Sequence, residues 1–284
     1  MNFKSGSDIM ILGSGGQLGS ELHKLYGDAI CYDHSPNGPN SIDFQNLDRL
    51  ETVILNSDVK WIINSAAFTN VDACETNKEF AYKVNGLAVK SIVDASKKIN
   101  ANLVHVSTDY IFDGSTGQYK EYDFPNPVNY YGISKLIGET FAQGYEKSII
   151  VRTSGVYGSK NNFPNFVYRN LKETKRVKVL DGYYSPIHAT NLAIAIKSLI
   201  ENNRFGLYNV SGIRTSRLDL ALQIAMKYNL DRTLIEKVEK IESFKAVRPF
   251  DSSLDISSSK KIIDFDFYSY ESNLRCFDST ISKT

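Results

Sequence analysis

The sequence predicts an α/β protein built on a doubly wound parallel sheet, with a smaller lobe formed by its C-terminal part. Short apolar runs typical of buried strands alternate with amphipathic stretches from the N-terminus to about residue 158. The first run ends at a glycine-rich turn that leads directly into a helical pattern. The predicted strands are Ile9–Leu12, Ala29–Tyr32, Trp61–Asn64, Leu103–Val106, Ser148–Thr153 and Leu207–Val210. The predicted helices include Leu18–Tyr26, Leu47–Leu55, Lys78–Ile99, Phe163–Leu171, Thr190–Ile200 and Ser216–Tyr228.

The glycines after the first strand have the spacing of a phosphate-binding turn. Gly13, Gly16 and Gly19 form the pattern G-x-x-G-x-x-G between strand and helix. The first would permit a tight turn, the second would let a diphosphate approach the backbone, and the third would let the helix pack closely on the strand. The helix N-terminus would add free N–H groups and a positive dipole. We therefore predict a Rossmann-type dinucleotide site; a glycine-rich turn without a ligand is the alternative.

A carboxylate follows the second predicted strand. Asp33 stands twenty residues beyond Gly13, close to the offset of about 20 expected of an acid that binds a cofactor ribose. Such a carboxylate accepts hydrogen bonds from the ribose hydroxyls and repels a 2′-phosphate, and no Arg or Lys lies between residues 29 and 48. The pattern predicts NADH or NADPH as cofactor, with NADH favoured; a plain turn residue is the alternative.

The ends of the third and fourth strands carry further candidates. Ligands of an open parallel sheet lie outside the carboxyl ends of its strands. There, Ala66 and Ala67 are small enough for a cofactor to approach, and the hydroxyl of Thr108 is well placed to bind a carbonyl oxygen. Asn85, inside the helical stretch Lys78–Ile99, is predicted to meet the next strand or the cofactor; a helix-surface position is the alternative.

Tyr131 and Lys135 are spaced four residues apart in the segment Tyr130–Glu139. On a helix such residues share a face, so the ammonium would lie beside the phenol and lower the tyrosine pKa from its usual value of about 10. A phenol tuned in this way can exchange a proton with an alcohol or ketone near neutral pH. The pair predicts redox chemistry on a carbonyl that Thr108 orients, with Tyr131 and Lys135 also at the cofactor, where Lys135 would hydrogen-bond the nicotinamide ribose. An ordinary exposed helix face is the alternative.

The regular alternation ends near residue 158, which predicts two parts. Residues 1–158 would form the dinucleotide-binding Rossmann domain. Residues 159–284 would form mainly a substrate-binding lobe, interleaved with a returning strand and helix of the Rossmann domain at about 190–212. In this second part, Arg248 could hold a diphosphate by a bidentate contact or could form a surface ion pair.

Composition excludes several kinds of partner. The net charge is +1, from 33 basic and 32 acidic residues, which argues against nucleic acid and against an acidic membrane surface. We see no apolar run long enough to span a membrane and no spacing of metal ligands. The three cysteines fit a reducing compartment, and Met1–Asp8 lacks the apolar stretch of a signal peptide, so we expect a cytoplasmic protein.

Longer motifs make the sequence similar to the extended short-chain dehydrogenase/reductases, and within them to the dTDP-4-dehydrorhamnose reductase family. These motifs are G-G-Q-L-G at 15–19, A-A-F-T-N-V-D-A-C-E at 66–75, V-S-T-D-Y-I-F-D-G at 106–114, Y-G-I-S-K-L-I-G-E at 131–139, R-T-S-G-V-Y-G at 152–158 and R-P-F-D-S-S-L-D at 248–255. The resemblance covers nearly the whole chain. It implies an NAD(P)H-dependent oxidoreductase of dTDP-rhamnose biosynthesis, which reduces the 4-keto group of a nucleotide-linked 6-deoxysugar to give dTDP-L-rhamnose. It also implies a homodimer.

The resemblance assigns roles to individual residues. For the cofactor, it implies that the diphosphate meets Gly16, Gln17 and Leu18, the adenosine end meets Asp33, Asp43 and Phe44, and the centre meets Ala67, Phe68 and Thr69. For the substrate, it implies that Thr108 and Asp109 contact the sugar. It also implies that Tyr131 and Lys135 are catalytic. One position departs from the family. The family usually has a tryptophan after Arg-Thr-Ser, taken to pack against the substrate, where this chain has Gly155. The departure removes a large contact surface and bears on which base and sugar the substrate carries.

Two other functions are compatible with the same residues. A sugar-nucleotide epimerase would use the same three side chains but return the hydride, so net cofactor consumption separates it from a reductase. A non-catalytic regulatory subunit, similar to that of methionine adenosyltransferase, would use the cofactor pocket to bind a partner. The presence of Thr108, Tyr131 and Lys135 together argues against a purely regulatory role.

Overall fold

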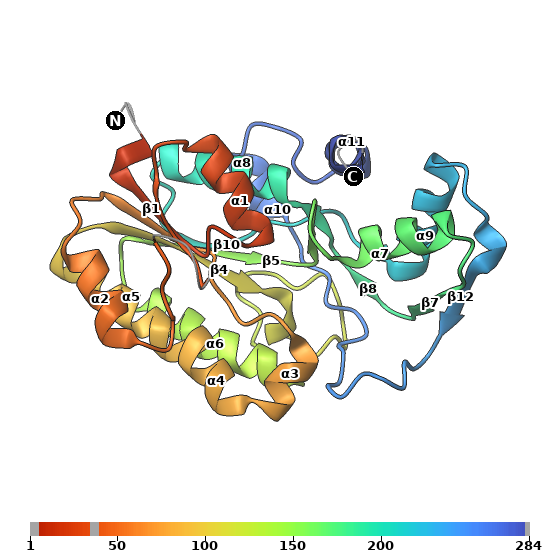
Figure 1. Ribbon diagram of the computed structural model, residues 1–284, viewed down its shortest axis with the longest axis horizontal. Helices are drawn as coiled ribbons and strands as arrows, with labels where there is room; N and C mark the ends of the chain where they lie inside the picture. The colour runs from red at the N-terminus through yellow and green to blue at the C-terminus, as the bar shows by residue number, and fades with distance from the viewer. Residues whose placement is uncertain (1–5, 35–39, 282–284) are drawn as a thin grey trace.

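The structure, a computed structural model, describes residues 6–34 and 40–281 of the chain. At its centre lies a six-stranded sheet with the order β10-β5-β4-β3-β1-β2, in which neighbouring strands run parallel (Figure 1). Its strands are β1 (Ile9–Leu12), β2 (Ile30–Tyr32), β3 (Trp61–Asn64), β4 (Asn102–Thr108), β5 (Ser148–Thr153) and β10 (Gly206–Asn209). The predicted fold class is confirmed.

Helices cover both faces of this sheet (Figure 1). One face carries α1 (Gln17–Leu25), α8 (Ala189–Glu201) and α10 (Ser257–Ile262), and the other carries α2 (Leu47–Leu55), α5 (Ala88–Lys98) and α6 (Tyr130–Gln143). Successive side chains of a strand point to opposite faces. In β1, accordingly, Ile9 and Ile11 enter one hydrophobic core and Met10 and Leu12 enter the other. A strand covered on both sides needs no polar face, which explains its unbroken apolar run.

The helical stretch predicted over Lys78–Ile99 is helical from Lys78 to Lys98 and changes type in its middle. It consists of α4 (Lys78–Tyr82), a π-helical turn (Lys83–Leu87) and α5. The turn packs against α6 so closely that a Cβ at Gly138 would lie 2.1 Å from the carbonyl oxygen of Asn85. The predicted helical stretch is confirmed, and its π-helical turn was not predicted, because one extra residue in the turn does not alter the apolar periodicity enough to be detected.

The second lobe lies at the right of Figure 1 and has its own hydrophobic core. It contains α7 (Phe163–Lys172), α9 (Arg217–Lys227), a parallel pair formed by β7 (Val177–Leu180) and β12 (Ile235–Val238), and an antiparallel pair formed by β8 (Tyr183–Tyr184) and β11 (Thr215–Ser216). These four strands were not predicted, because segments of two to four residues carry too little periodicity.

The chain passes between the two parts more than once. β6 (Val156–Tyr157) pairs in parallel with β9 (Ile187–His188), after which α8 and β10 return to the main sheet. The remaining elements are α3 (Val71–Thr76), α11 (Tyr270–Ile281) and the 3-10 turns Gly6–Asp8, Asp109–Ile111 and Arg232–Leu234. Among residues 6–34 and 40–281, no helix has the length and apolar character needed to cross a membrane.

Candidate active site

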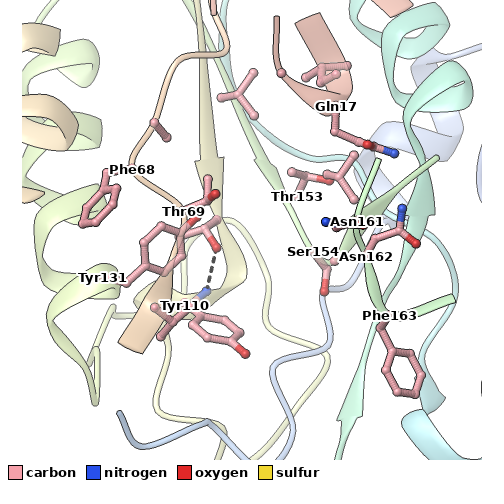
Figure 2. A pocket seen from close by; sticks show the side chains of 18 of the residues that line it. Gln17, Phe68, Thr69, Tyr110, Tyr131, Thr153, Ser154, Asn161, Asn162 and Phe163 are labelled. Atoms are coloured by element: carbon pink, nitrogen blue, oxygen red, sulfur yellow. Dashed lines mark hydrogen bonds between the residues drawn. The ribbon is translucent and has the colours of Figure 1, made fainter. Parts of the chain in front are cut away.

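A cleft of about 1360 Å³ lies where the carboxyl ends of the sheet strands face the second lobe. Figure 2 shows side chains on opposite sides of this cleft, with Phe68, Tyr110 and Tyr131 on one side and Gln17 and Ser154 on the other. Ligands of doubly wound sheets bind at this edge. The predicted ligand-binding residues are therefore expected to line this cleft.

The glycine turn closes one end of the cleft. Gly13 has a φ of +85°, and a Cβ there would lie 2.6 Å from the backbone nitrogen of Ala66, so only glycine fits this close approach. At Gly19 a Cβ would lie 2.1 Å from the carbonyl oxygen of Gly13, which explains the tight packing of α1 on the turn. Gly16 caps α1 without a side-chain hydrogen bond, so backbone N–H groups at the start of this helix are available to an anion.

Asp33 lies directly beside this turn. A Cβ at Gly15 would lie 2.4 Å from Asp33 Oδ2, so the glycine makes room for the carboxylate. Asp33 also forms a parallel bridge with Ser41, and Asp43 and Phe44 follow a short way along the chain and line the cleft. The residues that the resemblance assigns to the adenosine end thus lie together.

The segment after β3 forms the middle of the wall. Ala66, Ala67, Phe68 and Thr69 all line the cleft. Asn85 does not line it: the side chain is fully buried, accepts a hydrogen bond from Phe68 N at 2.8 Å and donates to Phe68 O at 3.1 Å. The structure therefore makes Asn85 a support of Phe68, because both ends of its amide are used in holding that backbone.

Tyr131 stands in the first turn of α6, which Asn129 caps by accepting a hydrogen bond from Gly132 N at 2.8 Å. Its ring lines the cleft and meets the ring of Tyr110 edge to face, with centroids 5.8 Å apart. Burial raises the pKa of Tyr131, while the nearby hydroxyl of Thr108 favours the phenolate and lowers it by less. The expected lowering of this pKa by Lys135 is wrong for the protein alone, because desolvation of the phenolate outweighs the favourable contacts.

Lys135 lies one helical turn further along α6 and is 2% exposed. Its Nζ donates a hydrogen bond to the carbonyl oxygen of Val106 at 2.7 Å, and it does not line the cleft, whereas Val106 does. Burial lowers the pKa of Lys135 to about 8, although Glu139 opposes the shift. An ammonium with this pKa changes charge close to the physiological range.

Thr108 ends β4, Asp109 begins the 3-10 turn that follows, and both line the cleft beside Tyr131. Asp109 is buried and accepts hydrogen bonds at 2.6 Å from the hydroxyls of both Ser154 and Ser252. Burial raises the pKa of this carboxyl, and the serines oppose that shift. We did not single out either serine from the sequence; their signal was their place in the R-T-S-G and R-P-F-D-S-S motifs.

Arg248 lines the cleft, but its guanidinium is already paired. It forms a bidentate contact with Asp72 of α3, with distances of 2.7 Å from Nη2 to Oδ2 and 3.1 Å from Nη1 to Oδ1. Although burial opposes the shift, hydrogen bonds from Arg248, Ala246 N and Lys245 N hold the pKa of Asp72 below its usual value. Of the two predictions for Arg248, the structure shows the ion pair.

Two residues of the second lobe, Tyr184 and Arg217, also line the cleft and had no signal in the sequence, because they belong to elements that were not predicted or begin at a boundary. Within the described part of the chain, no cluster of three or more His, Cys, Asp or Glu side chains could hold a metal ion.

Comparison with known proteins agrees with this geometry. The family model described as RmlD substrate binding domain matches residues 7–281. The dTDP-4-dehydrorhamnose reductase of Aggregatibacter actinomycetemcomitans is 34% identical over 273 residues, which cover 88% of this chain and 90% of that protein. A crystal structure of a hypothetical dTDP-4-dehydrorhamnose reductase from Sulfolobus tokodaii shares 46% identity and a TM-score of 0.87, covering 92% of this chain and 96% of that one.

A second solved structure adds a cofactor. The dTDP-4-dehydrorhamnose reductase of Bacillus anthracis, solved in complex with NADP, shares 30% identity and a TM-score of 0.87, covering 97% of this chain and 99% of that one. The family model and these relatives each extend over most of the sequence. The chain therefore belongs to the RmlD substrate binding domain family.

Proposed function

We propose that this protein is a reductase that uses NADH or NADPH to reduce the 4-keto group of dTDP-4-dehydrorhamnose, giving dTDP-L-rhamnose. One observation carries the proposal: a single cleft has the glycine turn at one end and Thr108 and Tyr131 further along, with Lys135 one helical turn behind Tyr131. The relatives named dTDP-4-dehydrorhamnose reductase support the same reaction.

The cleft fits a nicotinamide dinucleotide. Gly13, Gly15 and Gln17 line the cleft at the turn. The side-chain amide nitrogen of Gln17 is buried there without a hydrogen-bond partner among the described residues. When bound, the nicotinamide supplies the hydride that reduces the carbonyl carbon. The residues that would hold the cofactor are Gly13, Gly16, Gln17 and Leu18 at the diphosphate, Asp33, Asp43 and Phe44 at the adenosine, and Ala66, Ala67, Phe68 and Thr69 at the centre.

Tyr131 supplies the proton. Because burial raises its pKa, the phenol stays protonated at neutral pH and can donate from Oη to a substrate oxygen that gains charge. Thr108 orients this oxygen from the end of β4. Below pH 8 or so, Lys135 is an ammonium, and its charge favours the developing phenolate of Tyr131.

We favour NADH over NADPH, because Asp33 stands beside the turn where a 2′-phosphate would meet its negative charge. Since the relative from Bacillus anthracis was solved with NADP, both cofactors belong in the test. The measurement is kcat/KM for each cofactor at saturating sugar. A higher value with NADPH would overturn the preference.

The reaction itself is tested by mixing the protein with dTDP-4-dehydrorhamnose and either reduced cofactor, and following the nicotinamide absorbance. We expect stoichiometric oxidation of the cofactor and formation of dTDP-L-rhamnose. Sugar conversion without net cofactor consumption would support the epimerase instead. No conversion of this sugar with either cofactor would retire the proposal.

We also infer the division into a Rossmann domain at 1–158 and mainly a substrate-binding lobe at 159–284, interleaved with a returning strand and helix of the Rossmann domain at about 190–212. We further infer a homodimer and a cytoplasmic location. Limited proteolysis would test the division. Light scattering would test the dimer, and fractionation of the source cells would test the location. A monomer in solution would contradict the inferred homodimer.

A further inference from the structure

An aromatic ring from the second lobe occupies the space beside Gly155. A Cβ built at Gly155 would lie 2.7 Å from Cε2 of Tyr184 and 3.1 Å from its Cδ2. Carbon atoms do not pack at such distances, so any side chain at 155 would displace the ring. Gly155 is not among the glycines with positive φ. The need for glycine here is therefore spatial and comes from Tyr184.

The position of this ring is closely determined. Tyr184 is 7% exposed, lines the cleft, and pairs through its backbone with Thr215 in the β8–β11 ladder. The next residue, Ser185, donates its N–H to Ser154 Oγ at 3.1 Å, and Ser154 in turn donates to Asp109 at 2.6 Å. A short chain of hydrogen bonds thus ties the strand that carries Tyr184 to the residue next to Thr108.

Arg217 adds a positive charge to this ring. Its guanidinium lies over Tyr184, 4.9 Å from the ring centroid, and it also lines the cleft. In the part of the chain that the structure describes, neither Arg217 Nη1 nor Tyr184 Oη has a hydrogen-bond partner, although both are buried. Unsatisfied buried donors are costly, so a ligand that pairs with them would be favoured.

The charge also acts on the rest of this end of the cleft. Arg217 lowers the pKa of Asp109 and of Tyr110, although burial raises both overall. The guanidinium of Arg248, by contrast, is hydrogen-bonded to the carboxylate of Asp72. The end of the cleft nearest Asp109 therefore combines an aromatic ring with a cation that has hydrogen-bonding capacity left. This combination suits a sugar joined to a diphosphate.

We propose that Tyr184, with Arg217 over its ring, is the wall that holds the substrate's sugar opposite Tyr131, and that this ring takes the space that a side chain at residue 155 would need. The inference rests on the proposed reductase function and deepens it. Tyr184 acts here as a positioning residue that determines specificity, and Arg217 pairs with the diphosphate. The wall comes from a strand of the second lobe and not from residue 155. A large side chain at residue 155 and the ring of Tyr184 are therefore expected to exclude each other.

The test uses this mutual exclusion. Tyr184→Ala should raise the KM for dTDP-4-dehydrorhamnose about tenfold, because an aromatic contact is lost. Gly155→Trp alone should also raise KM, because the new ring collides with Tyr184. Gly155→Trp added to Tyr184→Ala should instead lower KM again, since it supplies a ring to the emptied space. Tyr184→Phe keeps the ring and should remain within about threefold of the wild type.

Two further measurements separate this role from a loss of folding. Thermal melting should show that each variant is folded, and cofactor affinity, followed by nicotinamide fluorescence, should change less than about twofold. Unchanged KM in Tyr184→Ala, or a parallel loss of cofactor affinity, would overturn the inference. So would a Gly155→Trp effect of the same sign and size in both backgrounds. An inactive wild type would overturn the proposed function as well, whereas an active wild type with unaffected variants would overturn the inference alone.

Discussion

The two walls of the cleft are built in different ways. The wall that would face the cofactor consists of residues directly after the strands β1 to β4 of one parallel sheet. The wall contributed by the second lobe consists of single residues from short strands, helix starts and loops, such as Tyr184, Arg217 and Phe163. The first wall follows from a repeated strand–helix unit, whereas the second depends on how the later part of the chain folds back.

This difference indicates where variation is tolerated. A change in the first wall alters a turn that several backbone groups share, as the approach of Gly13 to Ala66 shows. A change in the second wall can be compensated by a neighbour if, as we propose, a ring at residue 155 can replace the ring of Tyr184. We therefore expect large effects from the first wall and from Tyr131 between the walls, and smaller effects from the second.

The largest effect is expected at Tyr131, which lines the cleft together with both walls. Tyr131→Phe removes the proton donor but keeps the ring, so kcat should fall about 10²- to 10⁴-fold, the usual range for a lost general acid. Cofactor affinity should remain close to that of the wild type. Steady-state kinetics and a fluorescence titration measure the two quantities. Tyr122→Phe is the matched control, because Tyr122 is 75% exposed and does not line the cleft; full activity in Tyr131→Phe would refute the assignment.

The next largest effect should come from the glycine turn. Gly19→Ala places a methyl group 2.1 Å from the carbonyl oxygen of Gly13, so α1 must shift. Overpacking of this kind costs about 1–3 kcal/mol, which lowers Tm by several degrees. Cofactor affinity should fall more than about tenfold, because the N–H groups at the helix start move.

Gly27→Ala is the control for this change, since nothing lies within 4 Å of a Cβ at Gly27. Calorimetric melting and cofactor titration compare the two variants. If Gly19→Ala and Gly27→Ala behaved alike, the first wall would be less constrained than the structure indicates.

The pH dependence of turnover tests whether the positive charge of Lys135, which lies behind the cleft, is needed for the reaction. Burial lowers the pKa of this lysine to about 8, so the ammonium is present below that pH and is lost above it. The wild-type kcat should fall as pH rises through this value, to about a tenth one unit above it. Tyr131, whose pKa is raised, should not contribute to this limb. A kcat that stays level up to pH 9.5 or so would show that the charge of Lys135 is not used.

The smallest effect is expected at the Asp72–Arg248 pair, which joins α3 to the segment at 243–248 beside the cleft. Asp72→Asn should raise the KM for the sugar by about threefold and lower stability by at most about 1 kcal/mol, because the pair is partly exposed. Since Asp72 has a lowered pKa, its contribution exists above pH 4 or so and disappears as Asp72 protonates, so wild type and variant should converge in acid.

Chemical denaturation at several pH values measures this contribution. Glu79→Gln is the control, since Glu79 and Lys83 form an ion pair with side chains that are 81% and 40% exposed. A stability difference for Asp72→Asn that grew toward low pH would contradict the prediction.

The sequence alone was sufficient to predict the six strands of the main sheet, the position of Asp33 beside the glycine turn, and a helix that carries Tyr131 and Lys135. Each of these depends on neighbours within one strand–helix unit, where apolar periodicity and glycine spacing reflect local backbone geometry. The same information could not reveal that Asn85 is hydrogen-bonded to the backbone of Phe68 or that Arg248 is paired with Asp72, because both outcomes depend on partners distant in sequence.

Only the tertiary structure decided what surrounds the reacting end of the cleft. The upward shift of the Tyr131 pKa follows from burial by several segments. The role of Gly155 follows from the ring of Tyr184, 29 positions further along the chain. Desolvation and steric exclusion are properties of the packed molecule, since they arise from whichever atoms fill the surrounding space. A local pattern specifies which residue stands at the end of a strand, and the packed fold determines what that residue meets there.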